Sequence, residues 1–208
     1  RLKWGKIDFR LSRIFRAWKR LDGPSLRKRP IPSTVLWELT KVTWARKTAQ
    51  QLAATDLMWI GFFFLLRPSE YLDTITKNAF TLLDVLLKVG DLEYSGASIP
   101  LPLLPLVTSA GFKFDEQKNG VSGDIVLLGS TTDPVVGPLK CILRRVQHLR
   151  DRHASPGTPL FMFWDAAGTQ RRIADRSLNA FLRMGATLCG TDARCTAGAL
   201  RCTGATAL

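Results

Sequence analysis

The sequence is poor in the residues that usually bind metals or form disulfides. Its 208 residues include four cysteines and two histidines. The cysteines are Cys141, Cys189, Cys195 and Cys202, and no two of them have CxxC spacing. His148 and His153 lie in an arginine-rich segment, where we expect surface positions rather than ligands. The pattern therefore predicts no zinc or other metal site, and we expect the cysteines to be free, buried thiols.

The sequence also lacks long hydrophobic segments. Its longest nearly uninterrupted apolar run, residues 57–66, has ten residues. A membrane-spanning helix needs about 20 such residues, so we expect a buried helix here and no membrane partner. The amino-terminal residues are basic and carry no apolar stretch that ends in small residues, so we expect no secretion. A chain of this length can bury one sizeable core, or one domain and a piece of another.

Acidic residues are scarce near the amino terminus. The net charge of the chain is +13, and residues 1–50 carry 14 Lys or Arg against 3 Asp or Glu. Residues 51–208 are nearly balanced, with 16 against 14. A basic surface concentrated in one segment is typical of a protein that binds a polyanion such as nucleic acid. A solubilising cationic face or a membrane-surface patch are the alternatives.

Residues 6–21 have the pattern of an amphipathic helix. One arc is apolar and the opposite arc is basic, so the basic arc can face phosphates. An extended basic linker follows, and we place a domain boundary there, between residues 1–28 and 29–208. We predict that these two basic segments bind DNA. The residues concerned are Arg10, Arg13, Arg16, Arg20, Arg27, Lys28 and Arg29.

The rest of the chain predicts an α+β domain that is mostly helical. Apolar periodicity and end signals indicate helices over 33–47, 49–66, 139–152 and 175–188, and a last helix from about Ala199. Pro68 suits the first turn of a short helix after Arg67. Strands are expected over 83–89, 111–117 and 124–128, with Asn119-Gly120 as a hairpin turn. They would form a small three-stranded antiparallel sheet.

Four side chains have the chemistry of a phosphodiester site. Arg67 ends the long apolar run and Glu70 follows it, Lys118 precedes Asn119-Gly120, and Arg201 lies in Gly198-Ala-Leu-Arg201. A guanidinium grips two phosphate oxygens at once and stays protonated. Each residue alone has a structural alternative: Arg67 can pair with Glu70 across a helix junction, Lys118 can be a turn residue, and Arg201 a helix surface residue.

The three segments together resemble a known family. Phe-Phe-Phe-Leu-Leu-Arg67-Pro-Ser-Glu70, Gln-Lys118-Asn-Gly and Gly198-Ala-Leu-Arg201, with the small residues that follow, are similar in order and spacing to the conserved boxes of tyrosine recombinases (phage integrases). The resemblance covers residues 29–208. The sequences of the first two segments look most like those of recombinases from eukaryotic mobile elements, of the crypton or tyrosine-recombinase retrotransposon kind.

The resemblance implies site-specific DNA integration and recombination by transesterification, with no metal and no other cofactor. Arg67 and Arg201 would stabilise the scissile phosphate, and Glu70 would orient an arginine. Lys118 would protonate the departing 5′ oxygen. The implied partner is double-stranded DNA. Intact relatives assemble on it as homotetramers, but we do not expect this fragment to do so. The implied location is the nucleus in a eukaryote and otherwise the cytoplasm.

Two departures from the family pattern argue against cleavage by this chain. Gly198 stands where the family has a histidine, and the loss of such an acid–base group typically costs about 10²–10⁴-fold in rate. Tyr71 and Tyr94 are the only tyrosines, and neither lies where the nucleophile belongs. We therefore expect a fragment truncated at both ends that binds DNA and does not cut it. The alternative is a basic helical nucleic-acid-binding protein with no active site.

Overall fold

The computed structural model describes residues 30–75, 79–114, 123–191 and 194–207. These residues form an α+β fold. The helices are α2 (Ser33–Arg46), α3 (Ala49–Phe63), α4 (Pro68–Tyr71), α5 (Pro138–Asp151), α6 (Asp175–Leu188), α7 (Ala197–Ala207) and a 3-10 helix, η1 (Leu101–Leu106). The strands are β1 (Val85–Val89), β2 (Leu92–Ser95), β3 (Ser109–Phe114), β4 (Asp124–Gly129), β5 (Met162–Trp164) and β6 (Gln170–Arg172).

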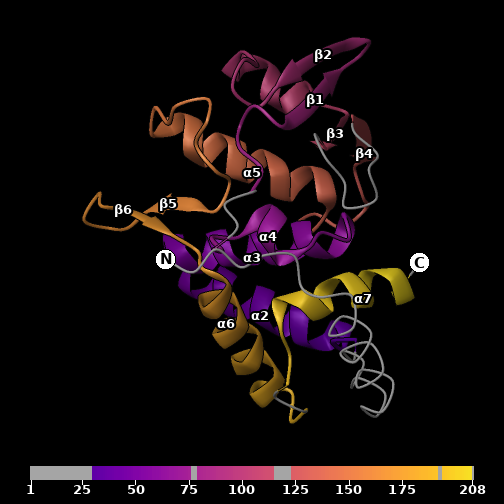
Figure 1. The fold of residues 1–208 in the computed structure, drawn as a ribbon, viewed down its shortest axis with the longest axis vertical. Coiled ribbons are helices and arrows are strands. Elements are labelled where there is room, and N and C mark those ends of the chain that lie inside the picture. The colour runs from indigo at the N-terminus through magenta and orange to yellow at the C-terminus, as the bar shows by residue number, and fades with distance from the viewer. Residues whose placement is uncertain (1–29, 76–78, 115–122, 192–193, 208) are drawn as a thin grey trace, which may run out of the picture.

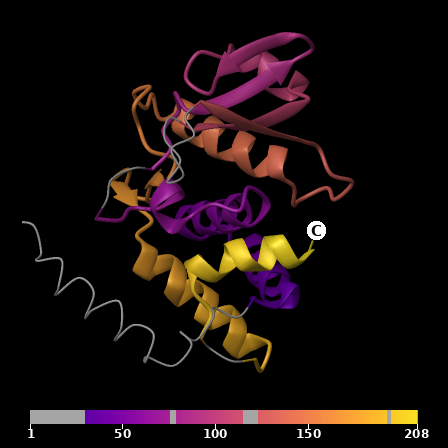
Figure 2. The same ribbon diagram turned by 45° about the vertical axis from the view of Figure 1, so that its right-hand side comes forward.

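Helix α3 is the centre of the fold. Every residue from Ala53 to Gly61 is buried, so this helix is covered on all sides and lies in the core. Helix α5 packs on one side of α3 and separates it from the larger sheet, while α2, α6 and α7 lie on the other side (Figures 1 and 2). The sheet and the helical layer thus share one core through α3 and α5.

The larger sheet has four strands, so the prediction of three was wrong. Its order is β2-β1-β3-β4 and all neighbours are antiparallel. The missed strand, β2, pairs with β1 across a two-residue turn of Gly90 and Asp91, and Gly90 has a φ of 59°. Gly-Asp is a hairpin signal because glycine adopts positive φ without strain, but this pair was expected only to end a strand.

A second, two-stranded sheet was also not predicted. Strands β5 and β6 pair antiparallel, with Met162 opposite Arg172 and Trp164 opposite Gln170. The Asp165 carboxylate organises the turn between them, since it accepts hydrogen bonds from the backbone N–H groups of Ala167 and Thr169. Figure 1 shows this hairpin beside α5 at the edge of the molecule.

The helices largely confirm the predicted positions. Helix α6 spans the predicted 175–188, and Pro68 occupies the first turn of α4. Helix α2 begins at Ser33, directly after Pro32, and no side-chain hydrogen bond caps its amino-terminal end. Helix α3 ends at Phe63 and not at residue 66, because the chain turns at Leu65, whose φ is 53°. No helix among the described residues is long and apolar enough to cross a membrane.

The cysteine prediction is confirmed in part. All four cysteines are free thiols, and Cys141 and Cys195 are buried, but Cys189 and Cys202 are partly exposed. Within the described ranges, no group of three or more metal-ligating side chains is found. The basic residues predicted to bind DNA, from Arg10 to Arg29, lie outside the described residues, as does the proposed first domain.

Candidate functional site

Arg67 lies at the junction between α3 and α4. It is the residue that caps α4, and its extended backbone (φ −78°, ψ 147°) directs the chain from one helix into the next. Glu70 binds it twice: Oε2 accepts from the Arg67 backbone N–H at 2.7 Å, and Oε1 accepts from Nη1 at 3.1 Å. The Arg67 side chain is 35% exposed. Glu70 therefore orients a partly exposed guanidinium. It also caps helix α4, and this purely structural role is the alternative to a role in binding.

Arg201 is exposed on α7, which packs against the same end of α3. The Tyr71 hydroxyl, just after Arg67 and Glu70, donates to the carbonyl oxygen of Ala197 at 3.5 Å. One turn beyond Arg201, Gly204 lies so close to α3 that an added Cβ would be 2.3 Å from the Phe62 carbonyl oxygen. Both arginines thus come from segments packed on the carboxyl-terminal end of α3 (Figure 2).

Lys118 lies outside the described residues, but the strands on either side of its segment are described. Strands β3 and β4 pair up to Phe114 and Asp124, which confirms the antiparallel pairing of the predicted hairpin's strands. The Phe114 ring contacts the Phe80 ring edge-on at 5.1 Å. Phe80 in turn donates its backbone N–H to the carbonyl oxygen of Glu70 at 2.8 Å. Phe80 therefore connects the base of the hairpin to the Arg67–Glu70 pair.

Neither tyrosine is placed as a nucleophile. Tyr71 is fully buried, and burial raises the pKa of its hydroxyl well above the ordinary value, so the reactive phenolate is disfavoured. Tyr94 lies on β2, in the four-stranded sheet, away from α7 in the fold (Figure 1). Gly198 is in the first turn of α7 and offers no acid–base group.

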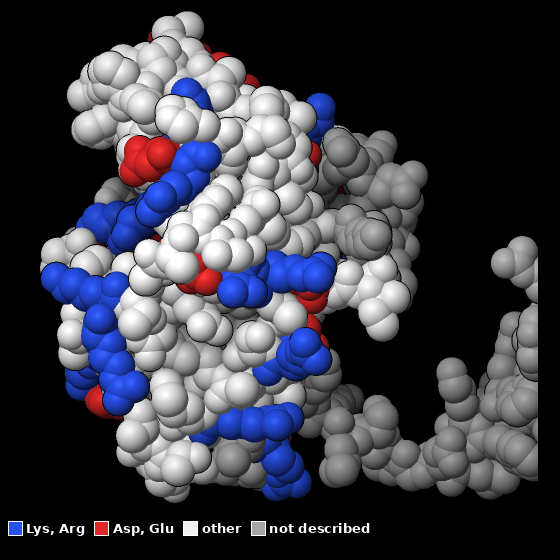
Figure 3. Space-filling view, turned by 90° about the vertical axis from the view of Figure 1, so that its left-hand side faces the viewer, with Lys and Arg blue, Asp and Glu red and all other residues white. Residues whose placement is uncertain are grey.

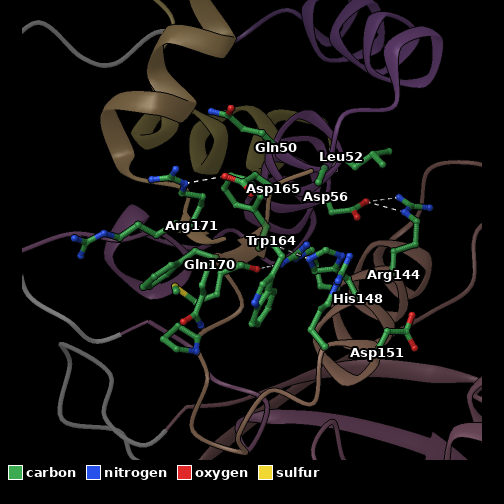
Figure 4. A pocket seen from close by; sticks show the side chains of 18 of the residues that line it. Gln50, Leu52, Asp56, Arg144, His148, Asp151, Trp164, Asp165, Gln170 and Arg171 are labelled. Atoms are coloured by element: carbon green, nitrogen blue, oxygen red, sulfur yellow. Dashed lines mark hydrogen bonds and ion pairs between the residues drawn. The ribbon is translucent and has the colours of Figure 1, made fainter. Parts of the chain in front are cut away.

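A separate cleft of about 1600 Å³ opens at the other end of α3. Its walls are the amino-terminal end of α3, the carboxyl-terminal half of α5 and the β5–β6 hairpin (Figure 4). Asp56 of α3, 6% exposed, accepts from Arg144 of α5 at 2.8 Å (Nε) and 2.5 Å (Nη2). Burial raises the pKa of the Asp56 carboxyl, and the charge of Arg144 opposes that rise.

The neighbouring Arg145 and His148 hold strand β5 in place. The buried Arg145 guanidinium donates to the carbonyl oxygens of Leu160 and Met162, and burial lowers its pKa to about 10. His148 is partly buried in the wall of the cleft, whereas His153 is exposed, as expected. Its Nε2 accepts the backbone N–H of Trp164 at 3.4 Å. Burial, and then the charges of Arg145 and Arg152, lower the His148 pKa to about 4, so it is neutral at pH 7.

Comparison with known proteins identifies no relative. No family model, no curated protein and no solved structure matches the chain.

The sequence pattern pointed to the residues around Arg67 but not to the cleft. The available signal was Asp56, a carboxylate amid the apolar residues of α3, which needs a buried partner. That partner, Arg144, is 88 residues away. Nothing in the local pattern distinguishes Arg144 from the other arginines of its helix.

Proposed function

We propose that this chain is tyrosine-recombinase-like, and that it binds duplex DNA at a backbone phosphate without cutting it. One observation carries the proposal. The Arg67 junction is linked to the base of the hairpin that contains Lys118 through Phe80, and to the start of α7, the helix of Arg201, through Tyr71. These are the three segments whose sequences resemble the recombinase boxes, and they are separated by up to 134 positions in the chain.

The two arginines supply complementary parts of a phosphate site. Arg67 is held by Glu70 through one terminal nitrogen, so its remaining N–H donors are directed elsewhere, and no other contact of this guanidinium is found among the described residues. Arg201 is exposed and free to adjust to a ligand. Two guanidinium groups on one phosphate provide several charge-assisted hydrogen bonds, which position a duplex without reading its sequence.

The chain's own residues support binding rather than cleavage. A recombinase forms a phosphotyrosine bond as the tyrosine oxygen attacks phosphorus and the 5′ oxygen leaves. Tyr71 is buried with its hydroxyl turned to a backbone carbonyl, and Gly198 replaces the box histidine. In this function Lys118 contributes charge to DNA binding. The basic residues 10–29 would extend the contact along the duplex. Tetrameric assembly on DNA belongs to intact relatives and is not proposed for this chain. In a eukaryote the protein would act in the nucleus.

The test is duplex binding as a function of salt. Fluorescence anisotropy of a labelled duplex of about 30 base pairs measures the affinity of the full chain and of Arg67→Gln and Arg201→Gln. Each phosphate contact contributes about 0.9 to the slope of log K against log salt concentration. We expect each variant to bind more weakly and to lose about that much slope.

Arg183→Gln is the matched control. Arg183 is an exposed arginine on α6, which carries none of the three segments, and its loss should leave the slope unchanged. If Arg67→Gln and Arg201→Gln behave like this control, the chain is a basic nucleic-acid-binding protein without a phosphate site. Incubation with supercoiled DNA should yield no covalent protein–DNA adduct, and any adduct would show that the chain cuts.

A further inference from the structure

The cleft at the amino-terminal end of α3 has no role in the function proposed above. We propose that it binds single-stranded nucleic acid, with a base stacked on Trp164 and phosphates held at Lys47 and Arg152. This site is independent of Arg67 and Arg201, which do not line the cleft.

The size of the cleft favours a polymer. Its volume is about 1600 Å³, whereas pockets for small cofactors usually measure roughly 300–1,000 Å³. It is partly open to solvent. It lies between two helices and a hairpin (Figure 4). A chain of nucleotides can lie along such a groove, while a small ligand would leave most of it filled with water.

The charges of the cleft favour an anion. Six Lys or Arg and four Asp line it. Three of the four carboxylates are already neutralised by ion pairs with arginines of the cleft itself. These pairs are Asp56–Arg144, Asp165–Arg171 and Asp73–Arg172. Their repulsion of a phosphate is therefore largely cancelled before any ligand arrives.

Two exposed cations remain at opposite walls. Lys47 lies at the α2–α3 junction, and Arg152 caps the carboxyl-terminal end of α5. Neither makes an ion pair with any residue that the structure describes. The first turn of α3, beside Lys47, contains no acidic residue, so the positive end of its dipole adds to their charge. Figure 3 shows that Lys and Arg are spread over the face that carries the β5–β6 hairpin, with few acidic residues between them.

The aromatic rings favour a single strand over a duplex or an acidic peptide. Trp164 is partly exposed, and its backbone is fixed by the pairing with Gln170 and by the hydrogen bond to His148. On the opposite wall, Trp44 is covered by the Arg144 guanidinium, which lies 5.7 Å from the ring centre. Basic grooves with fixed aromatic rings bind unpaired bases, because every base can stack on a ring. Bases in a duplex are not available for this contact, and carboxylate side chains do not need it.

The experiment measures the binding of labelled oligothymidylate to the full chain by fluorescence anisotropy. We expect Trp164→Leu, which keeps an apolar side chain but loses the ring, to weaken binding about tenfold. Trp164→Phe keeps a ring and should retain most of the affinity. Trp37→Leu is the matched control, because Trp37 is 37% exposed on α2 and does not line the cleft. Thermal melting checks that each variant is folded.

The charges are tested with the double variant Lys47→Gln/Arg152→Gln. It should lower the salt slope of oligothymidylate binding by about 1.4, which is roughly 0.7 for each lost contact with a single strand. The double variant Arg67→Gln/Arg201→Gln should lose duplex affinity but keep its affinity for oligothymidylate.

Three results would overturn the proposal. The first is an affinity for oligothymidylate that is unchanged in Trp164→Leu, as it is in the control Trp37→Leu. The second is equal competition by polyglutamate of the same charge, which would show that any flexible polyanion is bound. The third is loss of oligothymidylate binding in Arg67→Gln/Arg201→Gln as large as in the cleft variants, which would show that the cleft is not a separate site.

Discussion

Gly204 lies at the contact that brings α7 onto α3, and its replacement by alanine tests that contact. A Cβ at this position would be 2.3 Å from the Phe62 carbonyl oxygen and 2.5 Å from Cδ2 of Leu65. Ordinary contact begins at about 3.4 Å, so the two helices would have to separate by roughly 1 Å. The oxygen belongs to the backbone of a buried helix and cannot move aside as the end of a side chain could.

Two opposing effects decide the outcome. An alanine in a helix interior is more favourable than a glycine by about 1 kcal/mol. Overpacking costs typically 1–3 kcal/mol, and we take about 3 kcal/mol here because the clash is with backbone. We therefore expect Gly204→Ala to lose about 2 kcal/mol of the free energy of unfolding, which corresponds to a fall of roughly 4–8 °C in Tm.

Urea unfolding followed by tryptophan fluorescence measures the loss. Ala205→Gly, at the exposed neighbouring position, calibrates helix propensity alone and should cost about 1 kcal/mol. Because Gly204→Ala also moves Arg201 away from the Arg67 junction, it should weaken duplex binding too. If Gly204→Ala is as stable as the unmodified chain or more stable, α7 does not pack on α3 in this way.

Three further predictions concern the interior. Asp56→Ala leaves the Arg144 charge without its partner and should lower the free energy of unfolding in urea by about 3 kcal/mol. Glu38→Ala breaks an exposed pair on α2 and should lower it by less than about 1 kcal/mol. Equal losses would refute the buried pair. Burial lowers the His148 pKa from 6.5 to about 4, so the unfolded chain takes up this proton first and stability falls as the pH drops from about 6.5 to about 4. His148→Gln should flatten that part of the stability profile, and an unchanged profile would contradict the assignment. Tyr71→Phe removes a hydroxyl whose hydrogen bond to α7 is long, so a loss above about 1.5 kcal/mol would contradict the geometry.

Local signals in the sequence predicted most of the helices. The 175–188 helix was predicted at its full length because its apolar residues recur with the helical period. The Arg67–Glu70 pair was also predictable, because both residues lie within one turn of chain around Pro68. Strand β2 was missed because the Gly90-Asp91 pair was not interpreted as a hairpin turn that leads into a further strand. Strands β5 and β6 have three residues each, which is too few for an alternating pattern to be detected in the sequence.

Tertiary contacts determine the rest. The pairing of Asp56 with Arg144, and the packing of Gly204 on Phe62, join residues that are far apart in the chain. A lone aspartate in an apolar helix shows that a partner is needed but not which arginine provides it. The run of small residues after Arg201 permits a close helix contact, yet only the folded chain shows that the contact is with α3.

The most direct test of the central claim is a double-mutant cycle on duplex binding with Arg67→Gln and Arg201→Gln. If both guanidinium groups hold one phosphate, the double variant loses less affinity than the product of the two single losses, because either change alone already disrupts the shared contact. Independent losses that multiply, or no loss in either single variant, would contradict a shared phosphate site.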